Sequence, residues 1–238
     1  MPHTIRIPYQ SRAGVVFNIT PSLVSDIERL VDQVTADIVQ CKAADKFFAY
    51  LSVPISSRGG GHLGTNIEIA ASTTQHLETL FGEKLWVLNP AAYNLPNEAR
   101  GGDYMAVWAD VLAGTDGVGG ELDMVYFAGP ADVWRFFGVK EVDRIGVINQ
   151  WLSDRAAYDS EYKSLYDNPD SRSKFLKYYG IRGSSAYSKG AHDEWNIVTK
   201  FNRQRPIGAD IAIYFDGSPI EPGDFGDEAD LGYELLLH

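Results

Sequence analysis

The chain of 238 residues is 45% hydrophobic and 22% charged, a composition typical of a globular protein with one large, well-filled domain. Its net charge of −11 and isoelectric point near 4.8 argue against a general binder of nucleic acid or anionic membranes, because such binders need a basic surface. The single cysteine, Cys41, excludes an intramolecular disulfide framework and a zinc site built from clustered cysteines.

The N-terminal segment predicts two short strands joined by a turn and followed by a helix. The strands are "TIRIPY" (4–9) and "AGVVFNI" (13–19). Thr20 is the expected N-cap of the helix, and Pro21 is its first helical residue. Apolar residues at helical spacing then continue to about Cys41.

Strands and helices alternate over most of the remaining chain. Thr65 and Glu68 form a T-x-x-E capping box at the start of one helix, which Gly82 ends. Continuous apolar strands separated by helices predict a parallel sheet with right-handed crossovers. Strands are expected at 47–55, 84–91, 122–130 and 208–217, and helices at 65–82, 101–114, 131–138 and 228–238.

We therefore expect a doubly wound α/β domain of the flavodoxin- or Rossmann-like type over residues 1–238. Residues 139–205 are rich in Tyr, Lys, Arg, Ser and Asp and have helical patterns without a strong strand. They predict a mainly helical insertion, or a lid, within this domain. The stretch "SPIEPGDFGDE" (218–228) predicts a loop.

A glycine-rich loop, "SSRGGGHLGT" (56–65), follows the first predicted central strand and leads into a helix. Ligands of open α/β sheets bind at the carboxyl ends of strands, and a helix N-terminus attracts anions. Hydroxyls of Ser56 and Ser57, with the guanidinium of Arg58, would complete a cradle for a phosphate or carboxylate. The loop matches neither the Walker A pattern nor GxGxxG. The alternative is a flexible turn that only connects strand and helix.

Carboxylates follow the last predicted strand, near the same sheet edge. Glu234 lies in the apolar context "GYELLL", where a carboxylate should titrate high or need a partner. Such a group suits nucleophilic or acid–base chemistry. The alternative is a glutamate on the surface of a frayed helix.

The motifs "AYLSVPISSRGGG", "VLNPA", "ADIAIYFDG" and "GYEL" together resemble the nucleoside 2-deoxyribosyltransferase superfamily. That superfamily includes the 2′-deoxynucleoside 5′-monophosphate N-glycosidases and the hydroxymethyl-CMP hydrolases. The resemblance covers 46–137 and 207–238. The chain lacks the family's last helix and strand, and an N-terminal strand from 4–19 could replace that strand. The 139–205 insertion is foreign to the small members.

The resemblance implies roles for individual residues. Glu234 in the Tyr233-Glu234-Leu235 motif would attack or stabilise the anomeric carbon of the sugar, and an alternative alignment gives Asp230 this role. Asn89 would end the second strand at the site. The residues that would meet the sugar-phosphate end of the substrate are Ser56, Ser57, Arg58, Gly59, Gly60 and Gly61.

Further side chains are expected near this site. Asp132 follows the third central strand and could protonate the leaving base, or it could simply interact with free N–H groups at a helix N-terminus. Asp103 and Tyr104 begin a helix and could face the site. His62 is a candidate only through its loop, and its alternative is an exposed histidine. Aromatic and basic residues of the insertion could stack a base as a lid, or form the insertion's own core.

We therefore predict an N-glycosidase or N-(deoxy)ribosyltransferase that cleaves a nucleoside, nucleotide or related N-riboside. The alternatives are a TIR-like NAD glycohydrolase and a non-catalytic nucleotide-sensing domain.

No cofactor is expected, and the scattered histidines predict no metal site. The expected partners are a small-molecule substrate and further copies of the chain, since related folds often complete their sites with a neighbouring subunit. No stretch approaches the roughly 20 apolar residues of a membrane span, and the N-terminus lacks signal-peptide order, so we expect a cytoplasmic protein.

Overall fold

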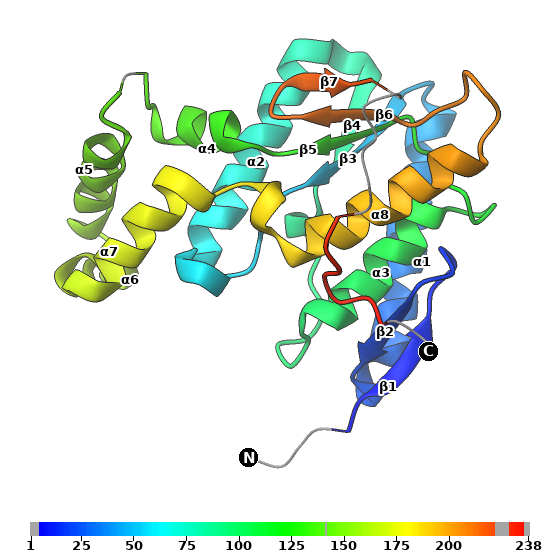
Figure 1. Ribbon diagram of the computed structural model, residues 1–238, viewed down its shortest axis with the longest axis horizontal. Helices are drawn as coiled ribbons and strands as arrows, with labels where there is room; N and C mark the ends of the chain where they lie inside the picture. The colour runs from blue at the N-terminus through cyan, green and yellow to red at the C-terminus, as the bar shows by residue number, and fades with distance from the viewer. Residues whose placement is uncertain (1–4, 141, 222–228, 236–238) are drawn as a thin grey trace.

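Four parallel strands and one antiparallel strand form the central sheet (Figure 1). The computed structural model describes residues 5–140, 142–221 and 229–235, and the strand order is β4-β3-β5-β6-β7. A mixed α/β fold is therefore confirmed, with a strand in each of the four predicted central segments. The strands are β3 (Phe47–Ser52), β4 (Leu85–Leu88), β5 (Met124–Phe127), β6 (Ala212–Phe215) and β7 (Ser218–Ile220).

Strand β7 lies where the sequence predicts a loop. Phe215 pairs with Ser218, so only Asp216 and Gly217 form the turn, with φ angles of 52° and 85°. An Asp-Gly pair with two positive φ angles is typical of the tight type I′ hairpin turn. The predicted loop is therefore wrong at its start, and its residues 222–228 lie outside the described part of the chain.

The described residues form the helices α1 (Val24–Ala43), α2 (Leu63–Phe81), α3 (Gly101–Ala113), α4 (Pro130–Phe137), α5 (Arg144–Ala156), α6 (Ser160–Asp167), α7 (Pro169–Lys177) and α8 (Lys189–Gln204). These helices cover both faces of the sheet. Phe48 and Tyr50 of β3 join a core with α1, α3 and α8, whereas Ala49 and Leu51 join a core with α2. Burial on both faces explains the continuous apolar sequence of β3. None of these helices is both long and apolar enough to cross a membrane.

The N-terminal strands β1 (Ile7–Gln10) and β2 (Val16–Ile19) form a separate antiparallel pair. The idea that they replace a missing strand of the main sheet is therefore wrong. They pack on α3, where the buried Asp103 carboxylate accepts hydrogen bonds from Thr20 N (2.6 Å) and Arg6 Nη2 (3.0 Å). Thr20 precedes the 3-10 turn that leads into α1, but its hydroxyl bonds to Asp103 (3.3 Å) and makes no capping bond.

The C-terminal segment 229–235 is irregular, with a bend at 232–233, and is not helical. Glu234 forms an isolated antiparallel bridge with Phe17 of β2, and Leu235 N donates to Val16 O (2.8 Å). The predicted closing helix is therefore wrong for the described residues, because contacts outside the segment use backbone groups that a helix would pair internally. Residues 228 and 236–238 lie outside the described chain.

The predicted insertion contains two parts. Helices α5, α6 and α7, with the π-helical turn η5 (Tyr178–Arg182), form an aromatic core with side chains of α2 and α4, and we call residues 144–182 the helical lobe. Figure 1 shows α5, α6 and α7 gathered at the left, beyond the ends of the strands that lead into α4 and η2 (Arg58–Gly60). Helix α8 instead returns to the sheet and packs against α3.

The Asp103 carboxylate is expected to anchor the N-terminal strand pair. Asp103→Ala would leave the buried N–H group of Thr20, the N–H group of Arg100 and the Arg6 guanidinium without their acceptor. We expect a loss of about 3 kcal/mol in the free energy of unfolding, measured by urea denaturation. The control Asp167→Ala removes an exposed ion pair with Lys163 and should cost about 0.5 kcal/mol. Equal losses in the two variants would contradict the anchoring role.

Candidate functional site

The glycine-rich loop after β3 is packed against the helical lobe. Gly59 and Gly60 have φ angles of 75° and 108°. A Cβ atom added at Gly60 would lie 2.9 Å from the Lys174 carbonyl oxygen, and one added at Gly61 would lie 3.0 Å from the Tyr178 ring. The glycines therefore allow α7 and η5 to approach the loop backbone closely.

His62 joins the same contact and begins α2. It is 8% exposed, so the exposed-histidine alternative is wrong. Its Nδ1 accepts a hydrogen bond from Thr65 N (3.2 Å), and its Nε2 contacts Glu161 Oε1 of the lobe at 2.9 Å. The predicted Thr65–Glu68 capping box is also wrong, because His62 occupies the N-cap position and Glu68 pairs with Arg155.

The start of the loop is its more exposed part. Ser56 and Ser57 are exposed. The carbonyl oxygens of Ile55 and Ser56 accept hydrogen bonds from Asn66 Nδ2 at 3.1 and 3.0 Å. The side chain of Arg58 lies outside the described part of the structure. A ligand at this loop would therefore meet Ser56, Ser57 and the exposed Gly59 backbone, since Gly60 and Gly61 lie against the lobe.

A buried carboxylate lies at the carboxyl end of β3. Glu194 of α8 is 7% exposed. Its Oε1 accepts a hydrogen bond from Tyr50 OH (2.6 Å), and its Oε2 accepts one from Ser52 Oγ (2.5 Å). Tyr50 and Ser52 are two residues apart on one strand and therefore project from the same face, so they hold both oxygens of the carboxylate.

Burial raises the pKa of Glu194 to about 7, and the neighbouring Asp193 charge adds to the rise, while the bonds from Ser52 and Tyr50 oppose it. The folded protein thus holds this proton more tightly than the unfolded chain. The resulting stability is complete below the unfolded pKa and is lost as the pH rises through about 7. A carboxyl that titrates near neutrality suits nucleophilic or acid–base chemistry.

The carboxylates predicted to be catalytic at the C-terminus lie elsewhere. Tyr233 and Glu234 donate their backbone N–H groups to Asp193 of α8 (2.7 and 3.4 Å), and the Tyr233 ring lies where a Cβ of Gly101 would be (2.2 Å). Asp230 is exposed and follows Ala229, whose backbone pairs with the Asn196 side chain on α8. These contacts place the segment against α3, α8 and β2, whereas the glycines contact the lobe.

Asp132 lies at the N-terminus of α4. Its buried carboxylate accepts hydrogen bonds from Gly129 N and Tyr126 OH (both 3.0 Å) and pairs with Arg135. Burial raises the pKa of Asp132, and the charge of Asp216 adds to the rise. This geometry agrees with the helix-terminus alternative, because a backbone N–H, a hydroxyl and a guanidinium already engage both oxygens.

The other predicted residues also have local partners. Asn89 Oδ1 accepts from Ala91 N (2.9 Å) and caps a 3-10 turn after β4. Asp103 binds the N-terminal strand pair, and Tyr104 OH accepts from Leu95 N (3.3 Å). The structure thus does not gather the predicted residues around one point.

Sequence reasoning missed Glu194. The sequence does contain a pattern that indicates its burial. The spacing i, i+3, i+4, i+7 of one helix face is occupied by Glu194, Ile197, Val198 and Phe201. The three apolar members are buried. A glutamate on an apolar stripe must be buried with a partner, and the hydroxyls of Tyr50 and Ser52 on β3 are that partner.

Two hollows of the surface lie at the amino ends of the strands. An open pocket of about 690 Å³ is bordered by Lys46, Lys84 and Trp86, and a smaller cavity of about 150 Å³ lies beside Phe48. We place the candidate site at the opposite edge, because open α/β sheets bind ligands at the carboxyl ends of their strands. In the described chain, no group of three or more His, Cys, Asp or Glu side chains is arranged to hold a metal ion.

The close packing of the loop predicts unequal costs for two glycine substitutions. Gly60→Ala and Gly138→Ala both introduce a Cβ at positive φ (108° and 71°), but nothing lies within 4 Å of the Cβ at Gly138. We expect Gly138→Ala to cost about 1–2 kcal/mol of unfolding free energy through strain, and Gly60→Ala to cost about 1–3 kcal/mol more through overpacking. Urea denaturation measures both, and equal costs would argue against a loop packed under the lobe.

No family model, curated protein or solved structure matches the chain. The resemblance to the nucleoside 2-deoxyribosyltransferase superfamily therefore stays a prediction.

Proposed function

We propose that the chain is an N-glycosidase or N-(deoxy)ribosyltransferase in which Glu194, in place of Glu234, acts at the anomeric carbon. The observation that carries the proposal is the buried Glu194 carboxyl, with a pKa near 7, held by Tyr50 and Ser52 at the end of β3. The substrate would be a small nucleoside, nucleotide or related N-riboside, without a cofactor.

The strand order supports this position for a site. From β3 the chain crosses to β4 on one side and then, through α3, to β5 on the other side of β3. In a doubly wound sheet of the Rossmann-like type, which we propose for this fold, the crevice between two such strands is the usual ligand position. Ser52 ends β3 beside Glu194, and Ala128 follows β5, where its carbonyl accepts hydrogen bonds from Ser185 N (2.9 Å) and Oγ (2.8 Å).

The proposed reaction needs one carboxylate, that of Glu194, beneath the sugar ring. Ionised Glu194 would attack the anomeric carbon and form an ester bond, while the N-glycosidic bond breaks and its electron pair leaves with the base, which takes a proton from water. Water, or the nitrogen of a second base, would then displace the ester and release Glu194. Tyr50 and Ser52 would orient the carboxylate through their two hydroxyls. The exposed Ser56–Ser57 end of the loop follows Ser52 after three residues and would contact the sugar or its phosphate.

The test compares two glutamates. Purified wild-type protein, Glu194→Gln and Glu234→Gln are incubated with nucleosides, nucleoside 5′-monophosphates and NAD, and free base is quantified by chromatography. Glu194→Gln should lower kcat/KM at least about 10³-fold. Glu234→Gln changes a half-exposed residue whose backbone bridges to β2, and it should change kcat/KM little. Because the ionised form attacks, wild-type kcat/KM should rise with pH through about 7. Full activity in Glu194→Gln would refute the assignment.

One observation favours a non-catalytic alternative. Glu194 is only 7% exposed, and Gly60 and Gly61 of the loop are packed against the lobe, so a substrate needs a narrow path to the carboxyl. Tight binding of a nucleotide without release of base would support a sensing or binding domain. Release of nicotinamide from NAD, without cleavage of deoxynucleosides, would support the TIR-like NAD glycohydrolase.

A further inference from the structure

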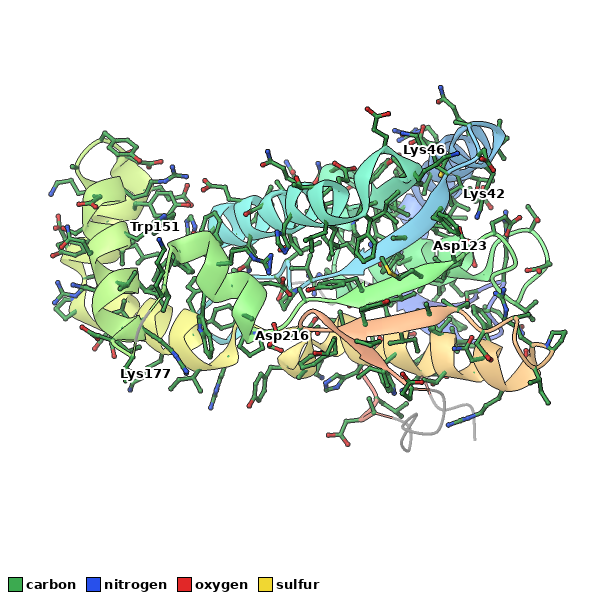
Figure 2. The ribbon with its side chains drawn as sticks, turned by 90° about the horizontal axis from the view of Figure 1, so that it is seen from above. Lys42, Lys46, Asp123, Trp151, Lys177 and Asp216 are labelled. Atoms are coloured by element: carbon green, nitrogen blue, oxygen red, sulfur yellow. The ribbon has the colours of Figure 1, made fainter. Side chains whose placement is uncertain are left out.

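A second site is suggested by the smaller cavity, at the opposite end of the sheet from Glu194. It measures about 150 Å³ and lies between the C-terminal ends of α1 and α3 and the start of β3. Its wall is largely apolar, with Ile38, Phe48, Leu112 and Leu122 among the lining residues. Figure 2 shows this end of the molecule, marked by Lys42 and Asp123, far from Trp151 and Lys177 of the helical lobe.

One carboxylate belongs to this apolar wall. Glu121 lines the cavity, and its Oε1 accepts a hydrogen bond from Thr115 Oγ1 (2.5 Å). Its Oε2 is buried and has no hydrogen-bond partner among the described residues. This oxygen lies against Gly114, where an added Cβ would come within 2.1 Å of it. A buried carboxylate oxygen without a donor is costly and calls for a partner that the described chain does not provide. Because this oxygen has almost no accessible surface, a ligand in the cavity would reach it through a turn of the Glu121 side chain.

The cation that borders the cavity is already engaged. Lys42 is also a lining residue, but its ammonium pairs with Asp123, which accepts a further hydrogen bond from Phe48 N (2.6 Å). Lys42 therefore neutralises Asp123, and the negative charge of Glu121 is left for another group.

We propose that this cavity binds a small organic cation, with a primary ammonium group on Glu121 and a single apolar ring or short chain against the aliphatic and aromatic wall. An ammonium supplies both the missing donor and the opposite charge, and the apolar lining favours a hydrophobic body. The volume, below the roughly 300 Å³ of ordinary ligand pockets, restricts the ligand to about one ring. The site is independent of the proposed N-glycosidase activity.

Benzylamine and its neutral analogue benzyl alcohol provide a matched pair of probes. Binding is followed by the NMR shifts of the methyl groups of Leu112 and Leu122 in the full-length protein. Wild-type protein should bind benzylamine at least about tenfold more tightly than benzyl alcohol, as a charge-assisted hydrogen bond predicts. Glu121→Gln should abolish this preference, and the control Glu83→Gln, which removes the same charge from an exposed position, should retain it.

A second variant separates loss of binding from loss of folding. Thr35→Phe narrows the cavity from a half-buried position on α1 and should prevent binding while the far-ultraviolet circular dichroism stays unchanged. Equal affinity for the amine and the alcohol, or no methyl shift at millimolar benzylamine, would overturn the proposal. A crystal structure grown with benzylamine that shows only water on Glu121 Oε2 would overturn it as well.

Discussion

Two adjacent carboxylates at the start of α8 hold together parts of the chain that are far apart in sequence. Glu194 points into the sheet and binds Tyr50 and Ser52 of β3, while Asp193 binds the backbone of 232–234. A carboxylate loses much hydration when it is buried, so each oxygen needs a donor. Helix α8 is therefore held against β3 and against the C-terminal segment by two neighbouring residues.

This constraint also explains how a reactive group could arise within a stable fold. The cost of burial that raises the pKa of Glu194 is the property that makes a carboxyl useful near neutral pH. The hydroxyls of Tyr50 and Ser52 limit that cost and fix the orientation of the carboxylate. The glycine-rich loop, by contrast, packs against the helical lobe through Gly60 and Gly61, and its exposed Ser56, Ser57 and Gly59 are the part left for a ligand.

The features that depend on local sequence could be predicted. The apolar run of β3 and the glycines that end α2, α3 and α4 follow from local burial and backbone freedom, and they were placed correctly. The prediction of a closing helix is wrong because backbone groups of this segment instead bond to the Asp193 carboxylate and bridge to β2. The predicted capping box is wrong for a similar reason. Glu161 of the lobe contacts His62 and holds it at the start of α2, where it takes the N-cap position.

The candidate site likewise depends on contacts between residues far apart in sequence, which local patterns do not predict. Helical spacing alone places Glu194 on the apolar face of α8, but its partner Tyr50 lies 144 residues away, and no local pattern joins the two. Glu234 was favoured because its neighbours in sequence are apolar. In the folded chain Tyr233 and Leu235 are half-buried in an irregular segment beside β2, and the two following leucines lie outside the described residues.

The central claim is that Glu194 titrates near neutral pH, and its carboxyl carbon can be observed directly. The protein is labelled with ¹³C at the glutamate Cδ, the Glu194 resonance is assigned by its loss in Glu194→Gln, and its shift is followed from pH 4 to 9. A midpoint near 7 would support the account. A midpoint near the ordinary glutamate value of about 4.3 would contradict it, because the carboxyl would then be neither desolvated nor poised for the proposed chemistry.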